Sequence, residues 1–360
     1  PIFDSYNFED RKLVEIVKAT YFNPKIVVID ETTTALSQEG REELYKHMER
    51  IRKSGNTVIF ISHDLPEIIE KSDTITILRD GVYIDTVKSK DVNENDLKKL
   101  MVGREVTGDY YRSDYGEKIS DEVVLSAKHV TVPGLIEDVS FDLHKGEILG
   151  FGGLSESGMH EIGKAIFGAS YDREGTVELA AGTQINDIPT AIKHSIAYTS
   201  KDRDNESVVL NQSIGDNICL PSLDELSGPA HLISDKKKKD FANKFAKQMS
   251  VKMVDVNQFV SNLSGGNKQK VVLARWIGKD SDIVVLDSPT QGIDIKVKQD
   301  IYQLMNQMRK NGKSIIMISE ELMELIGMCD RIMIMKDGKI SGELERDQNL
   351  DENGLITMMV

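Results

Sequence analysis

Two short segments in the last third of the chain carry residue types that could bind phosphate and a metal ion. The first is a turn of small and polar residues: Ser264, Gly265, Gly266 and Asn267. A run of helical periodicity follows from Lys268 to Ile277 and stops at Gly278, so the amides and the dipole of a helix N-terminus would favour an anion there. The second segment is a β-branched run, Ile283–Leu286, which ends on Asp287. A carboxylate at the end of a buried strand suits Mg²⁺, which prefers carboxylate and phosphate oxygens.

Each segment alone is more often a plain helix cap or a turn. Here, however, Leu263–Trp276 (LSGGNKQKVVLARW) is followed by Val284–Asp287 (VVLD) and Gln291–Asp294 (QGID). Together these segments resemble the signature and Walker B segments of ABC-transporter ATPases. The Asn-Lys-Gln-Lys continuation is most similar to the second cassette of the double-cassette subunits of bacterial sugar importers, of the ribose, galactose or xylose type.

The resemblance implies an α/β fold, a P-loop NTPase-like cassette with a mixed central sheet flanked by helices and an antiparallel β subdomain. It implies an ATP-binding, energy-coupling subunit that hydrolyses ATP, with ATP and Mg²⁺ as cofactors. The implied partners are integral-membrane permease subunits and, indirectly, a periplasmic or extracellular solute-binding protein. The protein would then be peripheral, at the cytoplasmic face of the cell membrane, and the transported solute would be chosen by its partners.

The sequence also matches itself when it is shifted by 257 positions, the separation between Ile26 and Ile283. At this shift Ile26–Ser37 aligns with Ile283–Asp294, and Lys53–Leu65 aligns with Lys310–Leu322. We therefore predict the C-terminal half of a first cassette in residues 1–104 and a nearly complete second cassette in residues 124–360. The polar residues 105–123 between them are predicted to be a linker.

The first, partial cassette has the catalytic residue types of the family. A predicted helix, Arg11–Thr20, leads into a predicted strand, Ile26–Ile29, which is followed by Asp30 and Glu31. By resemblance to the Walker B pattern, Asp30 would hold Mg²⁺, possibly through water, and Glu31 would act as general base. A second strand, Thr57–Ser62, delivers His63 to the same sheet edge, where it resembles the family's switch histidine. The segment that aligns with the signature, Tyr6–Asp10, contains Glu9, whose negative charge would repel phosphate.

The second cassette has the opposite character. Strands are predicted over Val123–Val130, Ser140–Leu143 and Ile148–Phe151, and the family's P-loop would follow the last of them. The residues at this degenerate P-loop are Gly153, Ser155, Ser157, Gly158, Met159 and His160. Met159 replaces the P-loop lysine, a loss of about 4 kcal/mol for a cation 4 Å from phosphate, and His160 replaces the serine or threonine. Ser288 and Glu320 stand where the catalytic glutamate and histidine belong, although Asp287 remains as a possible Mg²⁺ ligand. Residues 175–224 are predicted to form a small β-rich insertion.

Cassettes of this family pair head to tail, so each ATP lies between the catalytic residues of one cassette and the signature of the other. By this rule Asp30, Glu31 and His63 share a hydrolytic site with Ser264–Asn267, whereas the altered residues share a degenerate site. The P-loop of the hydrolytic site would lie ahead of residue 1, since the chain resembles the C-terminal part of a longer protein. We therefore expect these 360 residues alone to bind ATP poorly and to hydrolyse it negligibly.

Composition narrows the remaining choices. The net charge of −14 argues against nucleic acid as a partner, and two cysteines without CxxC spacing make no disulfide framework. No signal peptide is recognisable, and the apolar runs are too short to span a bilayer. Two alternatives stay open: a soluble ABC protein of translation or repair, and a non-catalytic scaffold that uses the cassette fold for interaction. An intact P-loop upstream would favour the enzyme, and co-purification with a permease would favour the importer.

Overall fold

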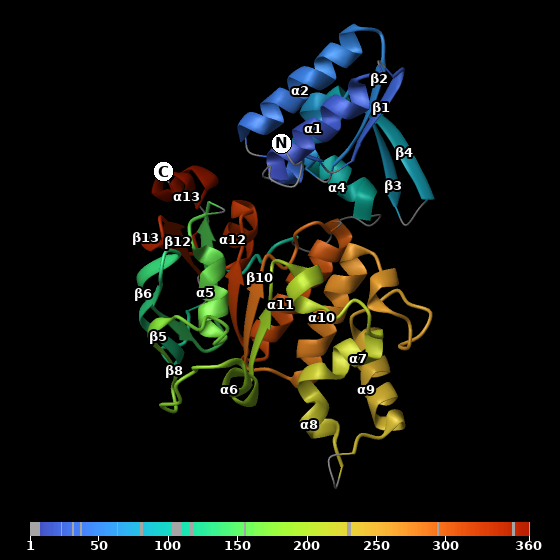
Figure 1. Ribbon diagram of the computed structural model, residues 1–360. Coiled ribbons are helices and arrows are strands. Elements are labelled where there is room, and N and C mark those ends of the chain that lie inside the picture. Colours follow the sequence, from blue (N-terminus) through green and yellow to red (C-terminus); the bar gives the residue numbers. More distant parts are fainter. Residues whose placement is uncertain are drawn as a thin grey trace. The chain divides into compact units, whose positions relative to one another are not determined.

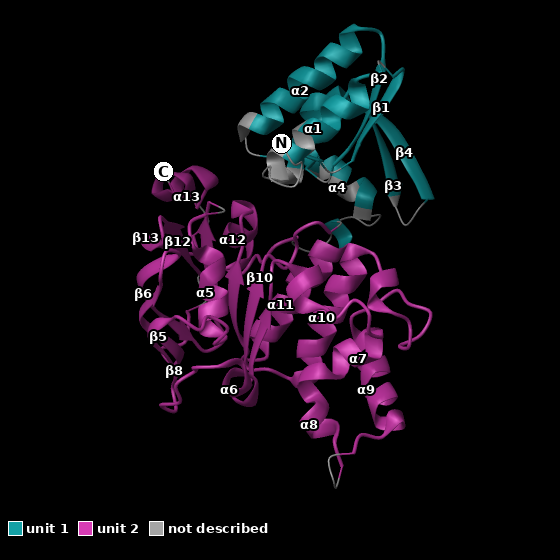
Figure 2. Ribbon diagram, viewed as in Figure 1, with its two compact units in different colours: residues 1–108, 294–296 teal, residues 109–293, 297–360 magenta. Residues whose placement is uncertain are grey.

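The chain forms two compact units in the computed structural model (Figure 2). The structure describes residues 8–22, 24–30, 32–36, 38–62, 64–79, 82–102, 110–115, 118–154, 156–228, 232–293, 295–347 and 350–359. Unit 1 comprises residues 1–108 together with 294–296, and unit 2 comprises residues 109–293 and 297–360. Each unit is considered by itself below.

Unit 1 contains two small sheets and the helices that cover them. Its elements are α1 (Phe8–Thr20), β1 (Ile26–Asp30), the 3-10 turn η2 (Thr32–Ala35), α2 (Gln38–Lys53), β2 (Thr57–Ile61), α3 (Leu65–Lys71), β3 (Thr74–Arg79), β4 (Val82–Lys88), η3 (Ser89–Asp91) and α4 (Glu94–Val102). Strands β1 and β2 are parallel, and β3 and β4 are antiparallel. A small core around Val27, Ile29 and Leu44 joins the β1–β2 pair to α2.

Unit 2 is built around a mixed six-stranded sheet of order β13-β12-β7-β11-β10-β9 and an antiparallel three-stranded sheet of order β6-β5-β8. Its strands are β5 (Val123–Val132), β6 (Ile136–His144), β7 (Ile148–Gly153), β8 (Glu174–Leu179), β9 (Ile196–Thr199), β10 (Ile283–Asp287), β11 (Ser314–Ile318), β12 (Arg331–Lys336) and β13 (Lys339–Glu345). Strands β9, β10, β11, β7 and β12 run parallel, because a helix or loop excursion returns the chain between them, and β13 pairs antiparallel with β12.

Helices occupy both the faces and one side of the larger sheet. They are α5 (Met159–Ile166), α6 (Ile188–Lys193), the π-helical turn η4 (Arg203–Ser207), α7 (Ile214–Cys219), η5 (Leu220–Ser222), α8 (Leu223–Leu226), α9 (Asp235–Gln248), η7 (Val260–Asn262), α10 (Gly265–Lys279), α11 (Ile295–Lys310), α12 (Leu322–Met328) and α13 (Glu352–Met359). Figure 1 shows α7, α8, α9 and α10 gathered on one side of the sheet and β5, β6 and β8 on the other. The predicted fold class, an α/β cassette with a mixed sheet and an antiparallel β subdomain, is confirmed.

The elements of unit 1 recur in unit 2 at the separation found in the sequence. Helix α2 (38–53) corresponds residue for residue to α11 (295–310), and α3 (65–71) corresponds to α12 (322–328). The β1–β2 register, Ile26 opposite Thr57, corresponds to the β10–β11 register, Ile283 opposite Ser314. Even the irregularity after Ile77 in β3 has its counterpart after Ile334 in β12.

The two units differ in what covers these shared strands. Val28 of β1 and Ile61 of β2 are 58% and 45% exposed. Their counterparts in unit 2, Val285 and Ile318, are completely buried beneath α5. The fit is close there, because a Cβ added at Gly163 of α5 would lie 3.0 Å from Ile318 and 3.4 Å from Val285.

Three expectations need correction. The first is the β-rich insertion over residues 175–224, which is wrong because β8 and β9 are the strands there and most of the remainder is helical. Asp187 caps α6 by accepting a hydrogen bond from the Thr190 amide. Ser213 and Asp216 form a reciprocal capping box at the start of α7. The Ser-x-x-Asp spacing is the signal in the sequence that could have identified this second helix.

The second correction concerns Gly278, which does not end the helix that follows the signature turn. Helix α10 begins at Gly265 and passes through Gly278 to Lys279, and it ends where Asp280 adopts a left-handed conformation (φ 57°). A Cβ at Gly278 would lie 2.8 Å from the ring of Phe241 in α9. This glycine therefore serves the close packing of two helices.

The third correction concerns the predicted linker, residues 105–123. Residues 103–109 and 116–117 lie outside the described part of the chain, but residues 110–115 pack against unit 2. The Arg112 guanidinium donates to the Met328 carbonyl (2.8 Å) and to Asp330 (2.7 Å), and Tyr111 lies against Gly327. This stretch is an integral part of unit 2.

Both cysteines of the chain, Cys219 and Cys329, are buried free thiols. Burial raises the pKa of Cys219 to about 11 and raises that of Cys329 further. Within the part of the chain that the structure describes, no helix combines the length and the apolar character needed to span a bilayer.

Candidate functional site

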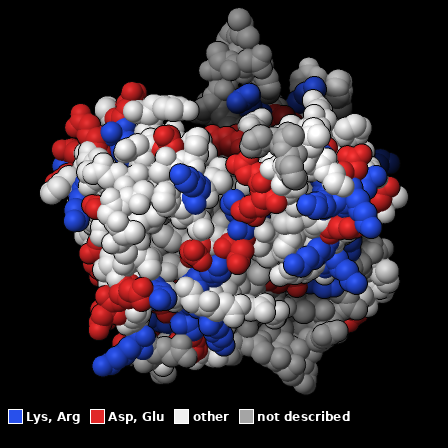
Figure 3. All heavy atoms as spheres, turned by 90° about the horizontal axis from the view of Figure 1, so that it is seen from below, with Lys and Arg blue, Asp and Glu red and all other residues white. Residues whose placement is uncertain are grey.

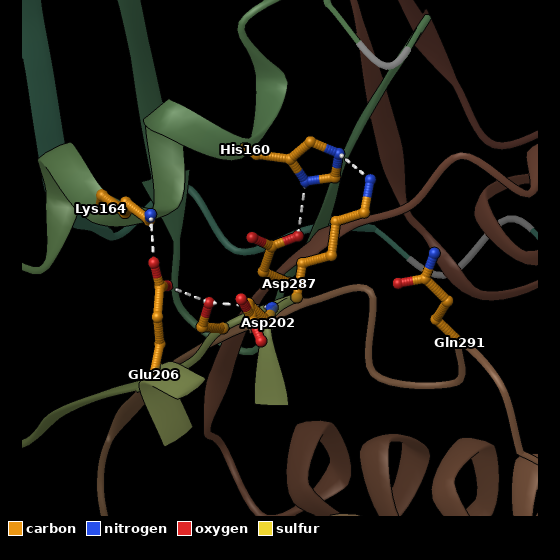
Figure 4. A pocket seen from close by; sticks show the side chains of 8 residues that line it. His160, Lys164, Asp202, Glu206, Asp287 and Gln291 are labelled. Carbon is orange, nitrogen blue, oxygen red and sulfur yellow. Dashed lines mark hydrogen bonds and ion pairs between the residues drawn. The ribbon is translucent and has the colours of Figure 1, made fainter. Parts of the chain in front are cut away.

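His160 and Asp287 form the centre of the candidate site in unit 2. Strand β10 carries Asp287 to the C-terminal end of the parallel strands, and the first turn of α5 places His160 over it (Figure 4). The His160 Nδ1 atom lies 2.7 Å from Asp287 Oδ1, and the Tyr198 hydroxyl donates to Oδ2 at 3.4 Å. The Asp287 side chain is 1% exposed, so these neighbours, rather than water, must stabilise its carboxyl group.

A second ion pair adjoins the first. Lys201 Nζ lies 2.8 Å from Glu320 Oε1 and 3.3 Å from His160 Nε2, which is itself 3.4 Å from Glu320. Burial alone would lower the pKa of His160, but its hydrogen bonds to Asp287 and Glu320 outweigh burial and raise the pKa to about 9. His160 is therefore a cation at neutral pH, held between two carboxylates.

These residues line a cavity of about 420 Å³. The lining side chains, several of them labelled in Figure 4, are His160, Lys164, Ser200, Lys201, Asp202, Glu206, Asp287 and Gln291. Lys164 lies 2.8 Å from Glu206, so each cation in the cavity is matched by a carboxylate. A site whose cations are already paired with carboxylates offers a triphosphate little electrostatic gain.

The turn before α5, which the sequence predicts to be a degenerate P-loop, is closed by two glycines and contains no lysine or arginine. A Cβ at Gly153 would lie 2.3 Å from Ser157 Oγ, and Gly158 has φ 88°, so glycine is required at both positions. Met159 is completely buried. The Ser157 amide donates to the Leu154 carbonyl at 2.8 Å and so is directed into the loop. Ser155 lies outside the described residues.

Mg²⁺ does not fit Asp287 in this arrangement. His160 stands at the position from which a P-loop serine or threonine would reach the metal, and its ring already occupies one carboxylate oxygen. Among the described residues no group of three or more His, Cys, Asp or Glu side chains could hold a metal ion. Asp30, at the end of β1, is exposed and makes no side-chain hydrogen bond with the described residues, so it remains compatible with Mg²⁺.

The signature turn has the features expected of a phosphate contact. Ser264 is exposed at the N-cap of the 15-residue helix α10, and its Oγ accepts a hydrogen bond from Asn267 Nδ2 (3.0 Å). A Cβ at Gly265 would lie 3.2 Å from the guanidinium of Arg203, whereas Lys268 is paired with Asp204 at 2.6 Å. Amides and a nearby guanidinium thus surround the turn.

The structure brings some of the predicted residues together and leaves others undescribed. His160, Asp287 and Glu320 converge in unit 2, whereas Met159 is buried in the core and does not line the cavity. Glu31 and His63 lie outside the described residues, and so do the first two residues of the segment Tyr6–Asp10. Lys164 and Glu206 were not anticipated, although Lys164 follows His160 by four residues, the spacing that places two side chains on one helix face.

Charges elsewhere are mixed in sign. On the face drawn in Figure 3, lysine and arginine side chains are interspersed with aspartate and glutamate side chains. A single basic patch of the kind that binds a nucleic-acid backbone is not visible on this face of the described residues.

Comparison with known proteins agrees with the resemblance found in the sequence. Residues 136–291 match the ABC transporter family. The chain is 40% identical over 344 residues to the ribose import ATP-binding protein RbsA of Lactococcus lactis, with 95% of this chain and 69% of the relative covered. It is 42% identical over 350 residues to the xylose import ATP-binding protein XylG of Thermoanaerobacter pseudethanolicus, with 94% and 68% covered.

Solved structures show the same fold at lower identity. A bacterial ABC transporter cassette solved as a dimer superposes with a TM-score of 0.55 at 21% identity, covering 62% of this chain and 99% of that cassette. A nucleotide-free ATP-binding cassette of an ABC transporter gives a TM-score of 0.56 at 17% identity, covering 66% and 99%.

Proposed function

This chain belongs to the ATP-binding subunits of ABC-type sugar importers, which couple ATP hydrolysis to transport, and we propose that it works with one hydrolytic and one degenerate nucleotide site. The proposed solutes are sugars of the ribose, galactose or xylose type, because the relatives are ribose and xylose import proteins. The observation that carries the asymmetry is the contact of His160 with Asp287, which fills the metal position of one site with an internal cation.

The duplicated elements support an assignment of the two sites. Unit 1 and the matching part of unit 2 are proposed to be two cassettes of one origin, since their helices and strand registers coincide at a constant separation. Asp30, Glu31 and His63 would then act with the signature turn Ser264–Asn267 on one ATP. Met159, His160, Ser288 and Glu320 would belong to the other site, which lacks a general base.

In the hydrolytic site each residue has a defined task. Glu31 accepts the proton of the attacking water, and His63 orients that water near the γ-phosphate. The exposed carboxylate of Asp30 would hold Mg²⁺, which supplies charge neutralisation on the phosphate oxygens when it is bound. The amides of the signature turn and the Ser264 hydroxyl would contact the phosphates from the other side.

The exposed face of β1 and β2 further supports this proposal. In unit 2, β7 pairs with both β11 and β12 and leads into the P-loop turn and α5. The counterparts of β11 and β12 in unit 1 are β2 and β3, which lie in separate sheets. A strand and helix of the kind formed by β7 and α5 would join the two small sheets of unit 1, cover Val28 and Ile61, and supply the phosphate loop.

We propose that the protein acts at the cytoplasmic face of the cell membrane, bound to permease subunits, with a solute-binding protein delivering the sugar from outside. Co-purification with a permease would separate this role from that of an ABC protein that never meets a membrane.

Mutation of the two sites tests the assignment directly. In the importer that contains this chain, Glu31→Gln should lower ATP turnover about 100- to 10,000-fold, because it removes the general base. Ser288→Glu should restore little activity, because His160 still occupies Asp287 and the P-loop lysine is still absent. ATPase assays with both variants provide the measurement. Full turnover in Glu31→Gln, or a large gain in Ser288→Glu, would refute the assignment.

A further inference from the structure

Each unit contains a buried glutamate that accepts hydrogen bonds from three hydroxyl groups. In unit 2 this residue is Glu324 of α12, whose side chain is 1% exposed. It accepts a hydrogen bond from Ser319 Oγ at 2.8 Å and from the hydroxyls of Thr290 and Tyr302. The three donors come from the end of β11, the loop after β10, and helix α11.

Unit 1 repeats this network residue for residue. Glu67 of α3, which is 5% exposed, accepts a hydrogen bond from Thr33 Oγ1 (3.1 Å), Ser62 Oγ (2.7 Å) and the Tyr45 hydroxyl. All four residues precede their counterparts Glu324, Thr290, Ser319 and Tyr302 by the same 257 positions. Burial, followed by the contact with the glutamate, raises the pKa of Tyr45, so this hydroxyl remains a donor throughout the physiological pH range.

Neighbouring contacts are repeated as well. Ser62 Oγ also accepts from the Asp64 amide (3.1 Å), just as Ser319 Oγ accepts from the Glu321 amide (3.0 Å). Such repetition of side-chain contacts in both units means that the network is a specific feature of the fold. A buried carboxyl group is expensive unless its oxygens are hydrogen-bonded, and here hydroxyl donors from three elements bond them.

The network fastens the two loops that carry the chemistry. In unit 2, Ser319 directly precedes Glu320, which contacts Lys201, and Thr290 follows Ser288 by two residues. In the sequence of unit 1, His63 directly follows Ser62, as Glu320 follows Ser319. Glu31 precedes Thr33 by two residues, as Ser288 precedes Thr290. One carboxylate thus ties the loop after each Walker B strand to the loop after the next parallel strand.

From this arrangement we propose that Glu67 is a positioning residue for ATP hydrolysis, holding the loops of Glu31 and His63 at a fixed separation, while Glu324 performs the same task for an inert site. The inference rests on the proposed function, because it takes the hydrolytic residues to be those of unit 1. A purely structural role would make the loss of Glu324, which also lies near Lys298, at least as harmful as the loss of Glu67. A positioning role predicts that only the loss of Glu67 lowers ATP turnover, although both glutamates bond the same three types of hydroxyl group.

The duplicated network supplies its own control. Glu67→Gln and Glu324→Gln each remove the acceptor of the same three types of hydroxyl donor. Glu324 also lies 3.6 Å from Lys298, so its loss should cost at least as much stability as the loss of Glu67. In the assembled importer, Glu67→Gln should lower kcat for ATP about 10- to 100-fold with KM changed less than about threefold, because a misplacement of 1 Å costs on the order of 100-fold in rate. Glu324→Gln should leave kcat within about threefold of the parent.

A milder pair keeps the test usable if the glutamine variants fold poorly. Ser62→Ala removes the donor next to His63, and Ser319→Ala removes its counterpart next to Glu320. We expect only Ser62→Ala to lower kcat. In Glu67→Gln, the backbone amides of residues 32–36 should exchange hydrogen faster than in the parent. Equal kcat losses in the two members of each pair would overturn the inference while leaving the proposed function intact. Full turnover in Glu31→Gln would instead overturn the proposed function.

Discussion

His160 lies in the first turn of α5, three residues after Ser157, and its Nδ1 atom is 2.7 Å from Asp287 Oδ1. The positively charged His160 ring supplies the buried Asp287 carboxylate with a compensating charge and a hydrogen bond, as a metal ion and a hydroxyl group would otherwise do. The sequence could indicate that Met159 and His160 depart from a phosphate loop. It could not indicate that His160 would pair with Asp287, because that contact joins residues 127 positions apart.

This pair predicts how the stability of unit 2 depends on pH. The pKa of His160 is raised to about 9 in the folded protein from an ordinary value of 6.5. Its contribution is therefore fully present below pH 6.5 and is lost as the pH rises through 9. A difference of this size corresponds to about 3 kcal/mol. Urea unfolding monitored from pH 6 to pH 10 should show the free energy of unfolding falling over this window.

His160→Gln is the matched control for the pH prediction. It cannot carry the charge, so its unfolding free energy should be lower than the parent's at pH 6, and the difference should shrink towards pH 10. The comparison reports the titration of His160 together with the side chains that contact it, Asp287, Glu320 and Lys201, whereas distant groups cancel. A difference that stays constant with pH would contradict the prediction.

At the scale of elements, segment 110–115 is a case in which a polar composition predicts a linker but the structure shows packed residues. Its polar residues suggested a spacer, yet Arg112 reaches Asp114 and Asp330 and is nearly inaccessible, with a side chain 1% exposed. Burial would lower the pKa of Arg112, but the hydrogen bonds to the two aspartates raise it, so the guanidinium stays charged. The partner Asp330 lies far along the sequence, and no local pattern points to it.

Replacing Arg112 by methionine should release this segment. The change leaves Asp330, whose side chain is 7% exposed, without its buried cation, and breaking such a pair costs about 3–5 kcal/mol. We expect a lower urea midpoint and faster hydrogen exchange of the amides in residues 110–115.

Lys118→Met provides the control, because Lys118 is an exposed cation near the same segment and its loss should change neither measurement. Unaltered exchange in Arg112→Met would mean that tyrosine packing alone holds the segment. That result would count against the ion pair as its anchor.

Helices and strands with a strong hydrophobic periodicity can be predicted from the sequence. Elements whose ends are set by capping residues or by contacts between distant residues are harder to predict. The strand Ile283–Leu286 and the helix after the signature turn appear where β-branched and helical runs predicted them. The helices α6 and α7 were missed, because their short apolar stretches resemble strands and only Asp187 and Ser213 mark their starts. In the sequence Gly278 indicates a helix stop, whereas in the structure it makes room for the ring of Phe241.

Over the whole molecule, the self-match at 257 positions predicts the recurrence of strands, registers and helices in the two units. What the alignment of residues could not reveal is the difference in cover: Val28 and Val285 are the same residue type in the same strand position, yet only Val28 is exposed. In the described residues of unit 1, the β1–β2 pair has no strand and helix comparable to β7 and α5.

This difference predicts weak nucleotide binding by the 360-residue chain. Unit 1 offers no phosphate loop among its described residues, and the cations in the cavity of unit 2 are already paired with carboxylates, so we expect a Kd for Mg-ATP weaker than about 1 mM, a binding free energy smaller than about 4 kcal/mol. Isothermal titration calorimetry measures it. Binding at millimolar strength or tighter, abolished by Asp287→Asn, would contradict the prediction.

The two buried thiols have a practical consequence for following this protein at work. Maleimide and similar reagents attack the thiolate, and both Cys219 and Cys329 are shielded from solvent and hard to deprotonate. A cysteine placed at an exposed site in each unit would therefore be labelled selectively, without first removing the native ones. A pair of dyes attached in this way would report the distance between the two units without removal of the native cysteines.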